Sequence, residues 1–214
     1  MKILITAGPT QEPIDPVRYI SNHSSGKMGI AIAEHFAAKG NEVILIKGPT
    51  ALKSKHPGIK EVNVVSAADM YAACAQYFQA SDVIVFAAAV ADYTPKTVSD
   101  KKIKKKESEF VLELVKTKDI AAELGKLKTG KQVSVGFALE TDNEYDNAQQ
   151  KLAKKNFDFV VLNSMQDAGA GFKHDTNKIT IIDKAGNVVK FDLKTKAEVA
   201  ADIVDYTYKT LAEK

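Results

Sequence analysis

The 214-residue sequence contains a single cysteine, Cys74. One thiol cannot form an internal disulfide, and this scarcity predicts a reducing, cytoplasmic location. Cys74 lies in the segment AADMYAACAQYF, where apolar residues recur at helical spacing. We therefore expect a buried structural thiol rather than a catalytic nucleophile.

Long apolar runs are also absent. No window supplies the ~18 uninterrupted apolar residues that a membrane span needs, and the apolar run after Met1 is too short for the core of a signal peptide. A strong charge of one sign is lacking as well, because 30 basic residues face 27 acidic ones and leave a net charge of +3. So small a bias does not argue for nucleic-acid binding. Neither a membrane nor a nucleic acid is an expected partner.

The two standard glycine-rich phosphate loops are missing from the N-terminal region. After the first apolar run the chain reads TAGPT, and Thr10 stands where the dinucleotide fingerprint G-x-G-x-x-G requires its second glycine. A Walker loop that ends at Gly26-Lys27 would need glycine at Ser21 and a hydroxyl residue at Met28. Any phosphate site in this region must therefore be built differently.

What the sequence does contain is a regular alternation of apolar β-branched runs with helical patterns. Continuous apolar runs are typical of buried parallel strands, and helices between them predict crossover connections. The expected strands cover residues 2–6, 42–47, 82–90, 110–115, 132–139 and 157–163, an expected hairpin covers 179–191, and the expected helices cover 28–40, 67–78, 119–127, 143–156 and 196–211. We predict one α/β domain over residues 1–214, with a Rossmann-like, doubly wound and mainly parallel sheet, flanking helices and a small β extension.

Hydrogen-bonding groups gather in YISNHSSGKMG, directly before the first helical pattern. Backbone N–H groups at a helix N-terminus, a glycine and a lysine are features that suit a phosphate. The alternative is that Ser24 or Ser25 merely caps the helix. Asn22 and His23 exceed what a cap requires, which favours a ligand site. His23 itself has no assigned chemistry, since no histidine or cysteine lies at metal-ligand spacing from it.

A second polar run, KKIKKK at residues 101–106, lies in a lysine-rich region, about 93–109, that we expect to form a flexible loop. Such runs are usually only a solvated surface. Ile103 divides the lysines, however, so an extended segment would carry Lys102, Lys104 and Lys106 on one face and could deliver an ammonium group to a triphosphate. No aromatic stacking platform accompanies the run, which counts against single-stranded nucleic acid.

Further candidates follow the expected strands, beyond whose carboxyl ends the ligands of open α/β sheets bind. Asp92 could hold a sugar hydroxyl or a metal-bound triphosphate, or it could cap a turn. Phe137 is either a core residue or a stacking partner for a base. Lys151 and Lys155 share one helix face and are either solvated or part of a site.

In their order along the chain, ITAGPTQEPIDPVRYISNHSSGKMG, AAAVADY, KIKK, VKTKDIA, VGFALET and QKLAKKNFDFVVLN closely resemble the motifs of phosphopantothenate–cysteine ligases. The resemblance covers nearly the whole chain. It implies an enzyme of coenzyme A biosynthesis that joins 4'-phosphopantothenate to L-cysteine through an acyl-cytidylate intermediate and releases pyrophosphate and CMP. Bacterial members use CTP with Mg²⁺ and eukaryotic ones favour ATP. A homodimer is implied as well.

The resemblance also implies roles for individual residues. Asn22 would bind the acyl intermediate, with Ser24, Ser25 and Gly26 beside the substrate, and Lys102 would contact a nucleotide phosphate. The other implied nucleotide-binding positions are Phe86, Ala87, Ala88, Asp92, Lys118, Asp119, Ile120, Ala121, Phe137, Lys151 and Lys155. No metal ligands are assigned. Because Met1 stands at the first strand, we expect a free-standing synthetase whose product passes to a separate flavin-dependent decarboxylase.

Two other classes of function remain open at this stage. A Rossmann-type nicotinamide oxidoreductase would need an acidic residue after its second strand, where Lys47-Gly48 stands. A non-catalytic nucleotide-sensing domain, or a partner of a flavoprotein, would bind nucleotide without turnover. The chain also departs from the ligase motifs at one point, since Thr117-Lys118 replaces the usual asparagine-proline.

Overall fold

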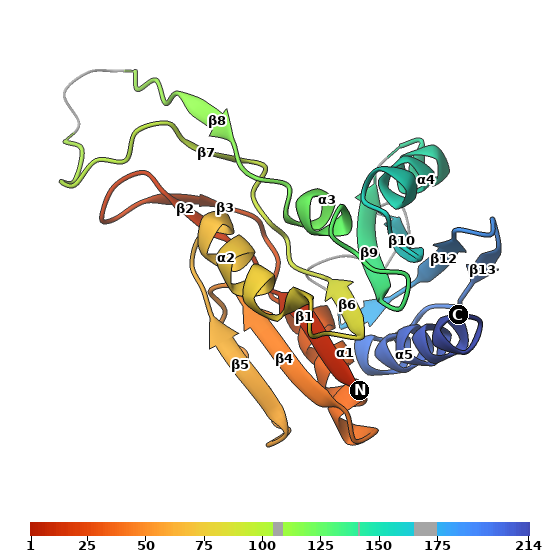
Figure 1. The fold of residues 1–214 in the computed structure, drawn as a ribbon. Coiled ribbons are helices and arrows are strands. Elements are labelled where there is room, and N and C mark those ends of the chain that lie inside the picture. Colours follow the sequence, from red (N-terminus) through yellow and green to blue (C-terminus); the bar gives the residue numbers. More distant parts are fainter. Residues whose placement is uncertain (105–108, 141, 165–174) are drawn as a thin grey trace.

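The computed structural model describes residues 1–104, 109–140, 142–164 and 175–214. The main sheet contains eight strands: β1 Lys2–Ala7, β4 Glu42–Lys47, β5 Ile59–Asn63, β6 Val83–Phe86, β9 Val133–Glu140, β10 Phe159–Ser164, β12 Ile179–Asp183 and β13 Val188–Lys190. Their order across the sheet is β13-β12-β10-β9-β6-β1-β4-β5 (Figure 1). The strands from β10 to β5 pair in parallel, and β12 and β13 add an antiparallel hairpin at one edge. The predicted fold class is confirmed.

The five expected helices are all present. They are α1 Lys27–Ala38, α2 Ala67–Phe78, α3 Ile120–Gly125, α4 Glu144–Lys154 and α5 Lys196–Ala212. α2 and α5 each begin with a capping box, in which Ser66 or Thr195 exchanges hydrogen bonds with the residue three positions later. None of the described helices combines the length and the apolar character that a membrane crossing requires.

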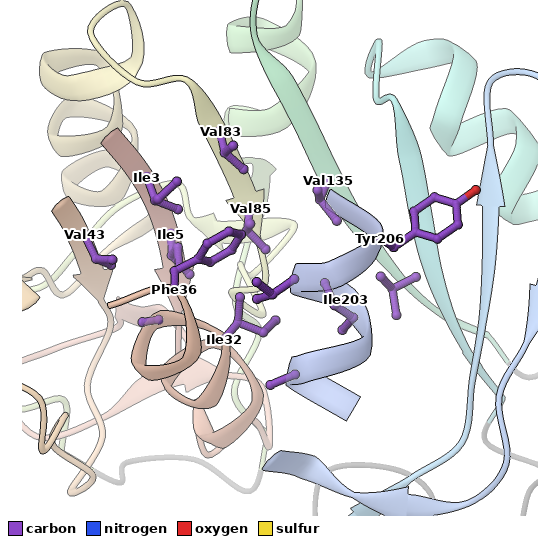
Figure 2. Packing of buried hydrophobic residues seen from close by; sticks show 14 of the residues in the cluster. Ile3, Ile5, Ile32, Phe36, Val43, Val83, Val85, Val135, Ile203 and Tyr206 are labelled. Carbon is purple, nitrogen blue, oxygen red and sulfur yellow. The ribbon is translucent and has the colours of Figure 1, made fainter. Parts of the chain in front are cut away.

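The helices cover both faces of the sheet. α1 and α5 pack on one face, where Ile5 of β1, Phe36 of α1 and Ile203 of α5 belong to one buried cluster (Figure 2). Successive side chains of a strand point to opposite faces, so strands covered on both sides need apolar residues throughout. This explains the continuous apolar runs of β1, β4 and β6.

The opposite face carries α2, α3 and α4. Leu4 of β1 packs there with Met70 and Cys74 of α2, and α4 covers the β9–β10 end. Cys74 is buried as predicted. Burial raises the pKa of its thiol to about 12, so the reactive thiolate is scarce at neutral pH.

The order in which the chain adds strands to the sheet changes direction between β1 and β6. From β1 it proceeds to β4 and then β5 at one edge, whereas from β6 it proceeds to β9 and β10 on the other side. Beyond the carboxyl ends of β1 and β6 the chain stays paired through a bridge between Pro9 and Ala89, and it then continues toward opposite sides of the sheet. Such a switch point is the usual position of a ligand crevice in open α/β sheets.

An arm projects beyond the main sheet (Figure 1). It consists of two antiparallel ladders, β2 Gln11–Pro13 with β3 Tyr19–Ser21, and β7 Tyr93–Pro95 with β8 Leu114–Lys116. β2 and β7 are in contact, so the two ladders lie side by side. A third small ladder joins β11 Thr176–Asn177 to β14 Lys194–Thr195. The sequence patterns did not predict these short pairs.

Two strand predictions were too long. The run 110–115 forms a strand only from Leu114, and Phe110 and Val111 are exposed, because β8 lies outside the main sheet. The run 82–90 leaves the sheet after Phe86, where the chain turns across the switch point, although Ala89 retains a single parallel bridge. Of the lysine-rich region, Lys105 and Lys106 lie outside the described residues.

The first helix begins without a side-chain cap. Its N-cap is Gly26, whose φ of 79° is left-handed, and Ser24 instead accepts the Gly26 N–H in a turn at 3.2 Å. A Cβ at Gly26 would lie 3.1 Å from the Cα of Gly8, so both the conformation and the close approach favour glycine. The N-cap position therefore belongs to Gly26 and not to Ser24 or Ser25, although the Lys27 N–H lies 3.5 Å from Oγ of Ser25.

Candidate functional site

A cavity of about 390 Å³ lies at the switch point, beyond the carboxyl ends of β1, β6 and β9. Its walls come from the loop after β6, the N-terminus of α1, the start of α3 and one face of α4. These elements meet because parallel strands end, and the helices that follow them begin, at the same edge of the sheet. The volume falls within the range of about 300–1,000 Å³ that is typical of small-molecule sites.

All but two of the residues predicted for the site line this cavity. They are Ser24, Ser25, Gly26, Phe86, Ala87, Ala88, Asp92, Lys118, Asp119, Ile120, Ala121, Phe137, Lys151 and Lys155. Within the described part of the chain, Asn22 and Lys102 lie outside the lining. The structure thus brings together segments that are more than a hundred residues apart in sequence. Their individual chemical roles stay predictions.

The loop after β6 forms one wall and is held by the loop after β1. The Ala91 N–H donates to Oγ1 of Thr10 at 3.0 Å, and the Ala89 N–H donates to the Gly8 carbonyl at 2.9 Å. From the other side, Oγ1 of Thr117 donates to the Ala91 carbonyl at 2.6 Å. Ala91 is therefore fixed by two elements at once, while Asp92 next to it remains exposed.

Asn22 holds the loop after β6 from outside the cavity. Its Nδ2 donates to the carbonyls of Ala89 and Val90, each at 3.1 Å. Both amide hydrogens are thus engaged with backbone, and the side chain holds the mouth of α1 against the loop after β6. Donation to a bound acyl group would require one of these two hydrogen bonds to open.

The α1 end of the cavity is basic. Lys27 forms an ion pair with Asp175 and lowers the pKa of that carboxyl. Lys196 lines the same end, is buried, and has its pKa lowered first by burial and then by Lys27. Two lysines near one paired carboxylate make this end attractive to an anion.

The α4 end carries two lysines, each paired with a carboxylate. Lys151 lies 2.7 Å from Glu140, and Lys155 lies 3.1 Å from Asp119. Asp119 also caps α3 through its side chain, which orients it. Lys118 lines the cavity as well, and its ammonium lies 4.0 Å from the centre of the Tyr71 ring on α2. Ion pairs of this kind hold lysine side chains in place until a stronger anion, such as a phosphate, competes for them.

Apolar groups separate these two ends. Phe86 and Phe157 are in ring contact, with centroids 5.7 Å apart. Phe137 lines the cavity and is half-buried, packed in part against the core. Its aromatic face is suitable for stacking against a base, and core packing and base stacking are both compatible with this position.

Sequence reasoning missed several polar residues that line the cavity, among them Asn163, Asn177 and Lys196. Asn163 belongs to β10 at its carboxyl end, so the strand rule could have found it. Asn177 and Lys196 carry no such signal, because their position depends on the β11–β14 ladder. There Asn177 donates to Oδ1 of Asn163 at 3.0 Å.

Among the described residues, no group of three or more His, Cys, Asp or Glu side chains could enclose a metal ion. This arrangement still fits Mg²⁺, which usually keeps several waters and binds through substrate phosphates and one or two carboxylates. Asp92 is an exposed carboxylate on the cavity lining and would be such a ligand.

Residues 1–211 match the family described as DNA/pantothenate metabolism flavoprotein, C-terminal domain. The chain belongs to this family. It is 43% identical to the crystal structure of the C-terminal domain of the coenzyme A biosynthesis bifunctional protein CoaBC, with a TM-score of 0.85, and the match covers 100% of this chain and 96% of that one. The predicted resemblance to the ligase family is confirmed.

Two longer proteins are similar to this chain over most of its length. CoaBC of Bacillus subtilis (strain 168) is 46% identical over 94% of this chain and 50% of its own length. A protein named cysteine/cysteine sulfinic acid decarboxylase, from an unknown prokaryotic organism, is 58% identical over 95% of this chain and 56% of its own length. The chain therefore spans about half the length of these curated relatives.

Proposed function

We propose that this chain condenses 4'-phosphopantothenate with L-cysteine at the expense of CTP, with release of pyrophosphate and CMP. The observation that carries the proposal is the cavity at the switch point, in a chain of this family, with lysines at both ends and an apolar middle. Lysines at two ends suit two phosphorylated substrates. The apolar middle suits a base or the pantoyl chain.

In the first step a carboxylate oxygen of phosphopantothenate attacks the α-phosphorus of CTP. The bond from the α-phosphorus to the bridging oxygen of pyrophosphate breaks, and an acyl-cytidylate anhydride forms. The attacking carboxylate is already ionised at pH 7, so the protein needs no general base here. Its tasks are alignment and charge neutralisation, for which the lining lysines Lys118, Lys151 and Lys155 are the candidates.

In the second step the amine of cysteine attacks the acyl carbon. The carbon–oxygen bond to CMP breaks, the amine loses a proton, and the amide product forms. Negative charge develops on the carbonyl oxygen during the attack, and a fixed donor at that oxygen lowers the barrier. We assign this donor to Asn22, one of whose two bonds to the Ala89 and Val90 carbonyls would open for the purpose.

Mg²⁺ would accompany the nucleotide, with Asp92 as its protein ligand, and would neutralise phosphate charge as pyrophosphate leaves. We also infer that decarboxylation of the product by a flavin-dependent enzyme follows, and that the reaction takes place in the cytoplasm.

A homodimer is the expected assembly. Its support is the set of exposed apolar side chains on the arm and on the segments that connect its strands: Val17, Tyr19, Tyr93, Val98, Phe110, Val111, Leu114 and Val115. Exposed apolar groups that gather on one part of a molecule mark interaction surfaces, and a two-fold dimer would bury the same surface of both copies.

The test is an assay of purified protein with phosphopantothenate, cysteine and each of the four nucleoside triphosphates in turn. We expect pyrophosphate release and amide product with CTP, both dependent on phosphopantothenate. Nucleotide binding without product would indicate a sensing domain instead. Carbon dioxide from cysteine or cysteine sulfinate would point to the activity for which the longer relative is named.

A further inference from the structure

Lys102 is attached to the arm through the residue that follows it. The Ile103 N–H donates to Oδ2 of Asp15 at 3.1 Å, and the Ile103 carbonyl accepts from the Arg18 guanidinium at 3.0 Å. Asp15 and Arg18 both lie in the turn between β2 and β3. The turn therefore holds both polar backbone groups of Ile103.

The residue before Lys102 is held as well. Oγ of Ser99 donates to the Lys101 carbonyl at 2.6 Å, and the Ser99 N–H donates to the Ile14 carbonyl at 3.0 Å in the same turn. The backbone is thus fixed on both sides of Lys102, while the Lys102 side chain is exposed. Residues 99–103 and the turn between β2 and β3 together hold the backbone of Lys102 in place, and we call this arrangement the Lys102 seat.

Asp15 is the centre of this seat. Its side chain has no solvent exposure, and its Oδ1 accepts the N–H groups of Val17 and Arg18, each at 2.9 Å. The guanidinium of Arg18 forms an ion pair with Oδ2, and this contact lowers the pKa of the Asp15 carboxyl. The carboxylate is therefore ionised, rigid and fully hydrogen-bonded, which makes it a strong acceptor for the Ile103 N–H.

We propose that Asp15 is a positioning residue for Lys102. It does not touch substrate; it fixes the backbone that carries the exposed Lys102 ammonium. This inference rests on the proposed function and on the nucleotide-phosphate contact that the resemblance to the ligase family implies for Lys102. Ordering a residue of a free chain costs conformational entropy, and a backbone fixed in advance spares nucleotide binding that cost.

The first experiment compares Asp15→Asn with Asp100→Asn. Asparagine keeps the shape of Asp15 but loses its charge and one acceptor oxygen. Asp100 is an exposed carboxylate beside the same lysines, and its substitution removes the same charge but leaves the hydrogen bonds of Asp15 and Arg18 to Ile103 in place. We expect Asp15→Asn to speed hydrogen exchange of the Ile103 amide about tenfold and to weaken CTP binding about tenfold in calorimetry, consistent with the loss of one charged hydrogen bond. Asp100→Asn should leave both unchanged. Equal behaviour of the two variants would overturn the proposal.

The second experiment is a double-mutant cycle in CTP affinity with Lys102→Gln. If Asp15 acts through Lys102, Asp15→Asn weakens CTP binding no further in the Lys102→Gln background. Additive losses would overturn the inference while leaving the phosphate contact of Lys102 intact. Normal CTP affinity in Lys102→Gln alone would instead refute that contact, and with it the reason for the seat. Both experiments measure CTP binding and not turnover. A failure of the proposed ligase activity would therefore be detected separately from a failure of this inference.

Should Asp15→Asn fail to fold, Ile103→Pro serves in its place. Proline removes the N–H donor at that position and leaves the Asp15–Arg18 ion pair intact. The same loss of CTP affinity, again absent in the Lys102→Gln background, is expected. Full affinity in Ile103→Pro would contradict the proposal.

Discussion

Lysine dominates the charged lining of the cavity, and each lining lysine is restrained by its surroundings. Lys27, Lys151 and Lys155 are paired with carboxylates, the Lys118 ammonium lies over the Tyr71 ring, and Lys196 is buried. An arriving phosphate therefore meets side chains whose rotamers are already limited, which reduces the entropy lost on binding. Phosphoryl chemistry depends on such positioning more than on a protein nucleophile.

Asn22 offers the sharpest test of a single side chain. We expect Asn22→Ala to lower turnover about 10²–10³-fold, the usual effect of removing one oxyanion donor, while the protein stays folded. The matched control is His23→Ala, because His23 is exposed and has no assigned role. Turnover and thermal unfolding would both be measured. Near-normal turnover in Asn22→Ala would refute the assigned role.

Lys151 and Lys154 form a second matched pair on α4. Lys151 lines the cavity, whereas Lys154 is exposed and does not belong to the described lining. We expect Lys151→Gln to raise the KM for CTP about tenfold or more, because a charged hydrogen bond contributes about 1.5–3 kcal/mol. Lys154→Gln should keep the original KM. Equal values for the two variants would place the triphosphate away from this end.

Single residues were predictable from sequence where a local rule applied. Asp92 and the Ser24–Gly26 segment were found because they follow strands or precede a helix, positions with known chemistry. Asn177 and Lys196 were not found, because their place in the cavity depends on a two-residue ladder. Asn22 lies beside the lining rather than within it. The sequence did not predict this position, because the hydrogen bonds of its amide to two carbonyls are tertiary contacts.

At the scale of elements, burial on both faces explains which predictions succeeded. β1, β4, β9 and β10 are covered by helices on both sides, so their apolar runs were unambiguous. β5 was missed because it is an edge strand whose IKEVN sequence is half polar. β2, β3 and β7 of the arm were missed because three residues carry too little periodicity for a pattern to emerge, whereas β8 was predicted in part by the run 110–115.

The contact between α1 and β1 sets one wall of the cavity, and Gly29 permits it. A Cβ at Gly29 would lie 2.6 Å from the Cβ of Ala7. We expect Gly29→Ala to destabilise the fold by about 1–2 kcal/mol, because the clash outweighs the gain of about 1 kcal/mol in helix propensity. Chemical denaturation would measure the change.

Gly130→Ala is the control for this prediction, since nothing lies within 4 Å of a Cβ at Gly130. Its stability should stay within about 0.5 kcal/mol of the original protein. Adding Ala7→Gly should recover part of the loss in Gly29→Ala. If Gly29→Ala were as stable as the control, the close packing of α1 against β1 would not depend on glycine at this position.

At the scale of the whole molecule, the exposed apolar side chains of the arm are the feature that the fold of a single chain explains least. Val111 is 88% exposed. If the arm forms the dimer interface, light scattering should give twice the monomer mass for the original protein, and Val111→Lys should shift it toward the monomer. Val188→Lys, at an exposed valine of β13, should remain dimeric. A monomeric original protein would refute the assembly.

The acyl-cytidylate route is the central claim, and an isotope tests it directly. Phosphopantothenate labelled with ¹⁸O in its carboxylate would react with CTP and cysteine, and the products would be weighed by mass spectrometry. Because the carboxylate oxygen bonds to the α-phosphorus and later leaves with it, we predict one ¹⁸O atom in CMP and none in pyrophosphate. Label in orthophosphate, or amide formed with unlabelled CMP, would contradict the account.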